Sequence, residues 1–181
     1  MSSPFRLRVA TMADEDGLHA LIAVSVRGLM PQAYSTSQLE AALGNWLGLD
    51  TQLIRDRTYF IVEKEDGTLV GCGGWSKRKT PFGSDHRANR EDELLDPATD
   101  AAKIRAFFVH PNHARQGIGK LLLDASEAAA IDAGFRRLEM GATLTGIPLY
   151  ERFGYTPAEH IDLPLGNGQV LPIIKMTKII P

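Results

Sequence analysis

The sequence has very little cysteine and no excess of positive charge. Cys72 is the only cysteine among 181 residues, so no disulfide can form within the chain. A reducing cytoplasmic compartment is therefore the simplest expectation. The formal net charge is -2 at pH 7, whereas a dedicated nucleic-acid binder usually carries a basic excess. We expect no nucleic-acid partner.

Long apolar runs are absent as well. No stretch approaches the roughly 18 to 20 apolar residues of a membrane span, and the opening residues MSSPFRLRV lack the apolar core of a secretory signal. Both absences predict a cytoplasmic protein without a membrane partner. A chain of 181 residues with ordinary composition can bury a core of its own, and we expect one domain over residues 1–181.

Apolar periodicity predicts alternating strands and helices along most of the chain. We expect a strand at RLRV, a helix after Thr11, a helix from Ser35 that reaches Trp46 and Leu47, a hairpin over 58–76, a strand at KIRAFFV, a helix over 117–133, a strand at RRLEMGAT, a short helix at IPLYERFGY and a last strand at VLPIIKMTKII. Glycines at 71, 73 and 74 suggest a bulge or a close backbone approach in the hairpin. Pro172 should interrupt the last strand or confine it to an edge.

Residues 77–100 are polar and contain charges of both signs. We interpret them as a long surface connection. Loops of this length are often functional, and we expect this one to border the acceptor site. Its run from Arg87 to Glu93 is most simply solvated surface.

A turn with two glycines lies between the strand KIRAFFV and the following helix. The free N–H groups of a helix N-terminus bind anions, and Gly117 and Gly119 would let a phosphate approach the backbone. Residues 101–123 contain no Asp or Glu but several cations. Glycines can also serve the turn alone. The spacing fits neither a dinucleotide fingerprint nor a P-loop, because Leu122 and Leu121 occupy the positions that those motifs need.

Two signatures together resemble the GNAT superfamily of acyl-CoA-dependent N-acetyltransferases. The first is Val109-His110-Pro111 followed by the turn from Arg115 to Lys120, and the second is LYERFGY, a helix ending in Gly and an aromatic residue. The family usually places Gln or Arg three residues before the first glycine, where this chain has Ala114. It also often has an Asn seven residues before the helix Tyr, where this chain has Thr143.

The resemblance implies an α/β (α+β) fold, with a mixed, mostly antiparallel sheet of six or seven strands flanked by helices. Acyl-CoA would lie in the wedge between two splayed central strands, 104–109 and 137–142. The cofactor-binding residues that it implies are Phe107, Phe108, Val109, Arg115, Gln116, Gly117, Ile118, Gly119 and Lys120.

The chemistry of acetyl transfer needs a neutral amine, a polarised carbonyl and a proton for the leaving thiolate. The resemblance assigns the proton to Tyr150, although a Tyr on a short helix often serves packing alone. The general base stays open among Glu139, Asp100, Glu93 and His86, or an amine that arrives neutral.

For the remaining candidate residues we expect structural roles. His110 and His113 are three apart, but no nearby ligand completes a metal site, and we expect none. We expect Cys72 to be a small core residue. For Trp46 and Trp75 two places are open, the core and the lining of an acceptor pocket, and we expect the core for each.

The expected function is an N-acetyltransferase that uses acetyl-CoA as co-substrate and transfers the acetyl group directly to a primary amine. The acceptor is expected to be a small molecule rather than a protein, and a homodimer is left open. The alternative is a non-catalytic acyl-CoA-binding or regulatory module on the same fold. A missing base favours this alternative, and Tyr150 favours the enzyme.

Overall fold

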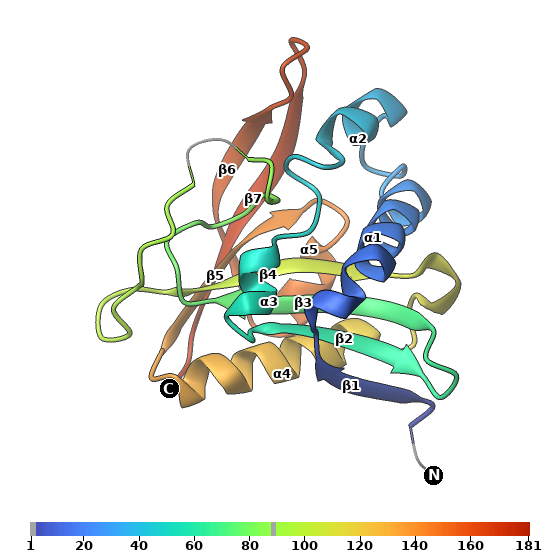
Figure 1. The fold of residues 1–181 in the computed structure, drawn as a ribbon. Coiled ribbons are helices and arrows are strands. Elements are labelled where there is room, and N and C mark those ends of the chain that lie inside the picture. The colour runs from blue at the N-terminus through green and yellow to red at the C-terminus, as the bar shows by residue number, and fades with distance from the viewer. Residues whose placement is uncertain (1–2, 88–89) are drawn as a thin grey trace.

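The computed structural model describes residues 3–87 and 90–181. It contains a seven-stranded sheet in the order β1-β2-β3-β4-β5-β7-β6 (Figure 1). The strands are β1 (Phe5–Val9), β2 (Tyr59–Lys64), β3 (Leu69–Ser76), β4 (Ala102–Val109), β5 (Arg137–Thr143), β6 (Thr156–Pro164) and β7 (Val170–Ile179). The α-helices are α1 (Glu15–Leu29), α2 (Thr36–Ala42), α3 (Thr51–Arg55), α4 (Ile118–Asp132) and α5 (Ile147–Arg152). The mixed sheet with flanking helices confirms the expected fold class.

Alternation along the strands creates one core on each face of the sheet. In β2, Tyr59 and Ile61 belong to the core that contains side chains of α1, α2 and α3. Phe60 and Val62 point the other way and join the core that contains side chains of α4 and α5. Because β2 is covered on both faces, its sequence is almost continuously apolar. No helix in residues 3–87 or 90–181 has the length and apolar character to cross a membrane.

The sheet opens between its two central strands. β4 and β5 are parallel, and the only residue pairs that join them are Ala102 with Leu138 and Lys103 with Glu139. All other neighbouring strands are antiparallel. Beyond Lys103, the edge of β4 that faces β5 therefore has no strand partner.

A bulge shapes β4 at the start of this opening. The register with β3 shifts between Cys72 and Gly74, and Ala106 has a φ of 55°. The sequence predicted a bulge or a close backbone approach at the glycines of the hairpin, whereas this extra residue is on β4, opposite them. The close approach is confirmed at Gly74, where a Cβ would lie 2.1 Å from the carbonyl oxygen of Thr58. Gly73 leaves space for the ring of Phe107, since a Cβ at Gly73 would lie 2.4 Å from Phe107 Cδ1.

The second helix is shorter than its apolar spacing predicted. Ser35 and Gln38 form the expected capping box, but α2 ends at Ala42 because Leu43 is extended and Gly44 has a φ of 79°. Trp46 therefore leaves the helix, and its indole Nε1 donates to the carbonyl of Pro164 at 2.7 Å.

Pro172 does not interrupt the last strand. β7 is continuous, and it lies between β5 and β6 from Ile173 onward. Pro172 pairs only with β6, because the partner strand β5 ends at Thr143, opposite Ile173. The strand is thus locally at an edge where proline lacks its N–H, which agrees with the edge alternative.

Candidate active site

Tyr150 of α5 lies beside the opening between β4 and β5. It lines a cavity of about 70 Å³. The ring of Phe107 meets the ring of Tyr150 edge-on at 6.2 Å between centroids. Only 8 % of Tyr150 is exposed, and burial raises the pKa of its phenol well above the ordinary value. The hydroxyl therefore stays protonated near neutral pH and is available as a proton donor.

The walls of this cavity come from segments that are far apart in the sequence. The lining residues are Met30, Trp46–Gly48, Pro81–Gly83, Ile104–Phe108, Met140, Gly141, Thr143 and Tyr150. Phe82 reaches across to β5, where a Cβ at Gly141 would lie 2.8 Å from Phe82 Cδ1. Trp46 packs against Phe82, with 5.9 Å between ring centroids. Of the two readings of Trp46, the structure thus favours a place in the pocket wall, whereas Trp75 is 5 % exposed and packs in the core.

The glycine turn begins α4 as the sequence predicted. Gly117 is the N-cap, with a φ of 84° and no side-chain cap, and the first intrahelical bond runs from Leu121 N–H to Gly117 C=O. Among the described residues, no hydrogen bond from the N–H groups of Ile118, Gly119 or Lys120 is found. Three free backbone N–H donors at a helix N-terminus form a suitable binding site for a phosphate.

The side chains around the glycine turn differ in whether they are free to contact a bound phosphate. Arg115 is exposed, with a φ of 65°, and makes no ion pair with the described residues. Gln116 is exposed too. Lys120 instead pairs with Asp124 one turn along its own helix. A Cβ at Gly119 would lie 2.9 Å from Leu149 Cδ2 of α5, so Gly119 also permits the contact between α4 and α5.

The backbone of β4 offers an unpaired edge for a ligand. Of the three residues predicted to bind the cofactor through this edge, Phe107 and Val109 are partly buried and Phe108 is buried in the core. The N–H of Val109 donates to Ser25 Oγ of α1 at 3.1 Å. One of the predicted backbone donors is therefore already used within the protein.

Glu139 cannot act as a base in this cavity as the structure stands. It forms an ion pair with Lys103, and its other oxygen lies 3.5 Å from Lys175 Nζ. Its residue pair with Lys103 is where the two central strands still meet. Glu139 thus lies at the closed end of the wedge.

The other candidate bases also lie outside the cavity lining. Asp100 accepts the backbone N–H of Asp96 at 2.7 Å, and Glu93 pairs with Lys79 on the surface. His86 lines a second cavity. Among the described residues, no carboxylate or imidazole lines the cavity of Tyr150.

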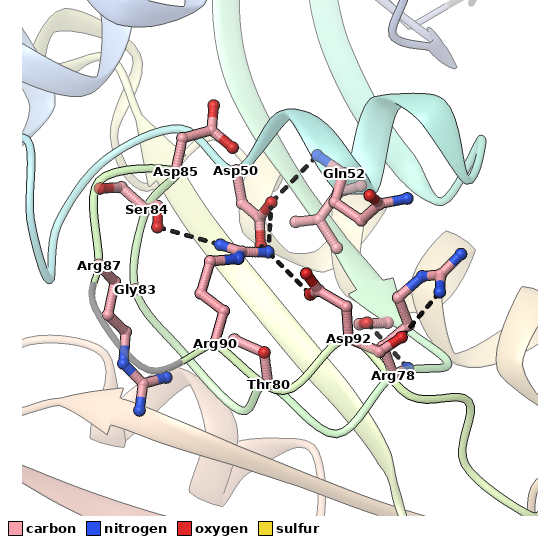
Figure 2. Close-up of polar contacts among 12 residues, drawn as sticks. Asp50, Gln52, Arg78, Thr80, Gly83, Ser84, Asp85, Arg87, Arg90 and Asp92 are labelled. Atoms are coloured by element: carbon pink, nitrogen blue, oxygen red, sulfur yellow. Dashed lines mark hydrogen bonds and ion pairs between the residues drawn. The ribbon is translucent and has the colours of Figure 1, made fainter.

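Residues 77–100 are held to the protein by buried ions, which the polarity of this connection did not predict. Asp50, 1 % exposed, bonds Arg105 of β4 at 2.9 Å and Arg90 of the connection at 3.0 Å. Arg105 also donates to the carbonyl oxygens of Thr80 and Gly83, at 3.0 and 2.8 Å. Figure 2 shows Arg90 beside Asp50.

The interpretation of the run from Arg87 to Glu93 as solvated surface is therefore wrong for Arg87 and Arg90, which are partly buried, and correct for 91–93, which are exposed. Residues 88–89 of this run lie outside the described residues. The side chain of Arg90 is only 16 % exposed. Asp50 could have been noticed as the residue before α3, where it also caps the helix by accepting from Gln52 N–H at 3.0 Å. Its partners are 40 and 55 residues away in the chain, and no local pattern connects them.

His110, in the turn after β4, serves local structure. Nδ1 of His110 accepts the backbone N–H of Asn112 at 3.1 Å and caps the short 3-10 turn Pro111–His113. No group of three or more potential metal-ligating side chains is found in the part of the chain that the structure describes. Cys72 is fully buried, as expected of a core residue.

Comparison with known structures places this fold among acetyltransferases. A GCN5-related N-acetyltransferase from Rhodopseudomonas palustris superposes with a TM-score of 0.71 at 23 % identity, covering 99 % of this chain and 98 % of that chain. The PaiA N-acetyltransferase from Thermoplasma acidophilum, in complex with coenzyme A, has a TM-score of 0.65 at 15 % identity, with 99 % of both chains covered. YncA from Salmonella typhimurium, with its cofactor acetyl-CoA, has a TM-score of 0.65 at 18 % identity, covering 99 % and 95 %.

A family model agrees with the fold and with both sequence signatures. The model described as the acetyltransferase (GNAT) family matches residues 25–155, a range that runs from α1 to the residue after Gly154. It includes the glycine turn, the unpaired edge of β4 and Tyr150. The chain belongs to the GNAT acetyltransferase family.

Proposed function

We propose that this protein is an N-acetyltransferase that moves the acetyl group of acetyl-CoA directly to a primary amine. One observation carries the proposal: a buried, protonated Tyr150 lies beside an unpaired strand edge. Membership of the family supports acetyl transfer in general. The amine acceptor and the direct route are our proposals.

The residues present fit acyl-CoA as co-substrate. The diphosphate would bind the free N–H groups at the start of α4, where Gly117 leaves open space and Arg115 adds positive charge. The pantetheine arm would run along the unpaired edge of β4 as an added strand does. Pro111 has no N–H and limits how far such pairing can continue.

Tyr150 would supply the proton for the leaving group. The amine nitrogen forms a bond to the thioester carbonyl carbon, and the bond from that carbon to sulfur breaks. The sulfur takes the phenolic proton of Tyr150, and the proton lost by the amine passes to solvent, which then restores the phenol. Because burial raises the pKa of Tyr150, the phenol is protonated before each turnover.

The shape of the cavity favours a small acceptor. Its volume is about 70 Å³, and the rings of Trp46 and Phe82 form part of its wall. Such a space suits the amine end of a small molecule better than a folded polypeptide. Since no carboxylate or imidazole is found in the described lining, we propose that the amine enters in its neutral form.

A thiol-release assay with acetyl-CoA and a panel of small amines and peptides tests the proposal. We expect at least one small amine to release free thiol and to gain an acetyl group, as measured by mass spectrometry. The alternative, a non-catalytic acyl-CoA-binding module, is favoured by the missing base. It would show calorimetric binding of acetyl-CoA with no thiol release for any acceptor.

A further inference from the structure

Arg87 lies against two of the rings that form the cavity wall. Its guanidinium carbon is 5.0 Å from the ring centroid of Trp46 and 5.2 Å from that of Phe82. Both rings line the cavity together with Tyr150. In Figure 2 the side chain of Arg87 extends away from Asp50 and Arg90. A positive charge is thus held against two rings of the cavity wall and apart from the neighbouring ion cluster, although Arg87 itself is not among the lining residues.

This charge differs from those of the arginines around it, which pair with carboxylates. Arg78 pairs with Asp56, and Arg90 pairs with Asp50. Arg87 forms no ion pair with any described residue. The residues that the structure does not describe (Met1, Ser2, Ala88 and Asn89) include no acid.

The guanidinium of Arg87 is also incompletely hydrogen-bonded. Nη1 donates to the carbonyl of Phe82 at 2.7 Å, whereas Nε is buried and has no partner among the described residues. No bond from Nη2 to a described residue is found. Burial lowers the pKa of this guanidinium, and the positive charge of Arg90 lowers it further against a weaker opposing effect of Glu91. Leaving a cation partly desolvated and unpaired costs free energy, which an incoming anion would recover.

The chain holds Arg87 in this place by specific packing. A Cβ at Gly83 would lie 2.5 Å from Arg87 Cδ, so the absence of a side chain at Gly83 makes room for the arginine stem. The bond to Phe82 and the contacts with the two rings restrict where the guanidinium can lie. The free hydrogens of Nη1 and Nη2 then form a fork that matches a carboxylate.

We infer that Arg87 binds a carboxylate of the acceptor, so that the acceptor is an amino acid or a similar small amine that carries a carboxylate. The amine would enter the cavity beside Tyr150, and the carboxylate would remain at the wall formed by Trp46 and Phe82. This inference rests on the proposed acetyltransferase function and names its substrate class.

Matched pairs of acceptors test the role of Arg87. The L-α-amino acids and their α-amides serve as probes, because each pair differs in the carboxylate but keeps the amine. We expect the wild type to prefer the acid of the best pair, and Arg87→Met to lower kcat/KM for that acid by about 10- to 100-fold, as expected for charge-assisted hydrogen bonds. The effect on the amide should be far smaller. Arg87→Lys should restore part of the preference, since it keeps the charge without the planar fork.

Arg55→Gln is the matched control, because Arg55 is exposed and, unlike Arg87, has no contact with the rings of Trp46 and Phe82 among the described residues. It should leave the preference for acids unchanged. A wild type without preference for acids, or an Arg87→Met variant that slows acids and amides equally, would overturn the inference. If no amine is acetylated at all, the proposed function fails by itself. Calorimetric titration of the same amino acids into CoA-saturated protein then decides: binding that Arg87→Met abolishes supports the inference, and no binding refutes it.

Discussion

At the scale of single residues, Tyr150 determines what the site can do. The sequence placed it on a short helix before Gly154, and the structure adds that its ring is buried against Phe107. No local pattern could show that Phe107 needs the space left by Gly73 on the neighbouring strand. The position of Tyr150 was thus predictable, whereas its surroundings depend on contacts distant in the sequence.

Replacing Tyr150 with Phe removes the hydroxyl and keeps the packed ring. We expect the single-turnover rate to fall by about 100- to 10,000-fold, the usual contribution of a positioned general acid. Folding should survive because no hydrogen bond of the Tyr150 hydroxyl to a described residue is found. Affinity for acetyl-CoA should barely change. A single-turnover rate within a few-fold of the wild type would show that Tyr150 is a packing residue, and that the thiolate leaves without its help.

The pH dependence of the reaction should follow the acceptor and not the protein. With no carboxylate or imidazole in the described lining of the cavity, log kcat/KM should rise by one per pH unit up to the pKa of the acceptor ammonium. That limit is about 10.4 for an amine resembling a lysine side chain. Burial raises the pKa of Tyr150, so its proton is not lost in this range.

Measuring the pH profile of kcat/KM with acceptor amines of different pKa tests this prediction. An amine of lower pKa should reach its plateau at a correspondingly lower pH. A plateau that stays at the same pH for every acceptor would instead reveal an ionising base on the protein.

At the scale of elements, sequence patterns located most strands and helices but not their ends. The capping box at Ser35 marked the start of α2 correctly. Its apolar spacing continues to Leu47, yet the helix ends at Ala42, and Leu47 is buried in a loop instead. The same burial that helical spacing indicates can be reached by a loop that folds onto the core. The short helix α3 and the largely exposed strand β6 were missed because neither has a clear apolar period.

The connection over 77–100 should depend on the charge of Asp50. Asp50→Asn keeps the side-chain volume but leaves Arg105 and Arg90 without their buried counter-ion. We expect a loss of about 3–5 kcal/mol in the free energy of unfolding, measured with denaturant. Acceptor kcat/KM should also fall more than acetyl-CoA affinity, because Phe82 and Gly83 of the connection line the cavity.

Asp92→Asn is the matched control for this change. Asp92 also pairs with Arg90, but its side chain is 47 % exposed, and exposed pairs contribute at most about 1 kcal/mol. Equal destabilisation by the two substitutions would show that burial of Asp50 does not anchor the connection.

At the scale of the whole molecule, the sheet consists of two parts with a narrow junction. β1 to β4 form one part and β5 to β7 the other, and two residue pairs join them. The order of elements along the chain predicted a mixed sheet, but only the resemblance to the family predicted that its centre would open. The structure adds a bulge at Ala106 and the ring of Phe107, both on β4 shortly after its last residue pair with β5.

Acetyl-CoA should therefore act as a bridge between the two parts of the sheet. A ligand that binds only the folded protein stabilises it by about 2.7 kcal/mol at a hundredfold excess over Kd, or roughly 5–10 °C in Tm for a chain of this size. If the ligand lies along β4, protection from hydrogen exchange should increase most at 104–109 and at the facing residues 140–143. Gly119→Val should reduce both effects, because a branched side chain would crowd the phosphate-binding site and Leu149. Increased protection confined to other strands would place acetyl-CoA elsewhere, and the open centre of the sheet would then have no part in binding it.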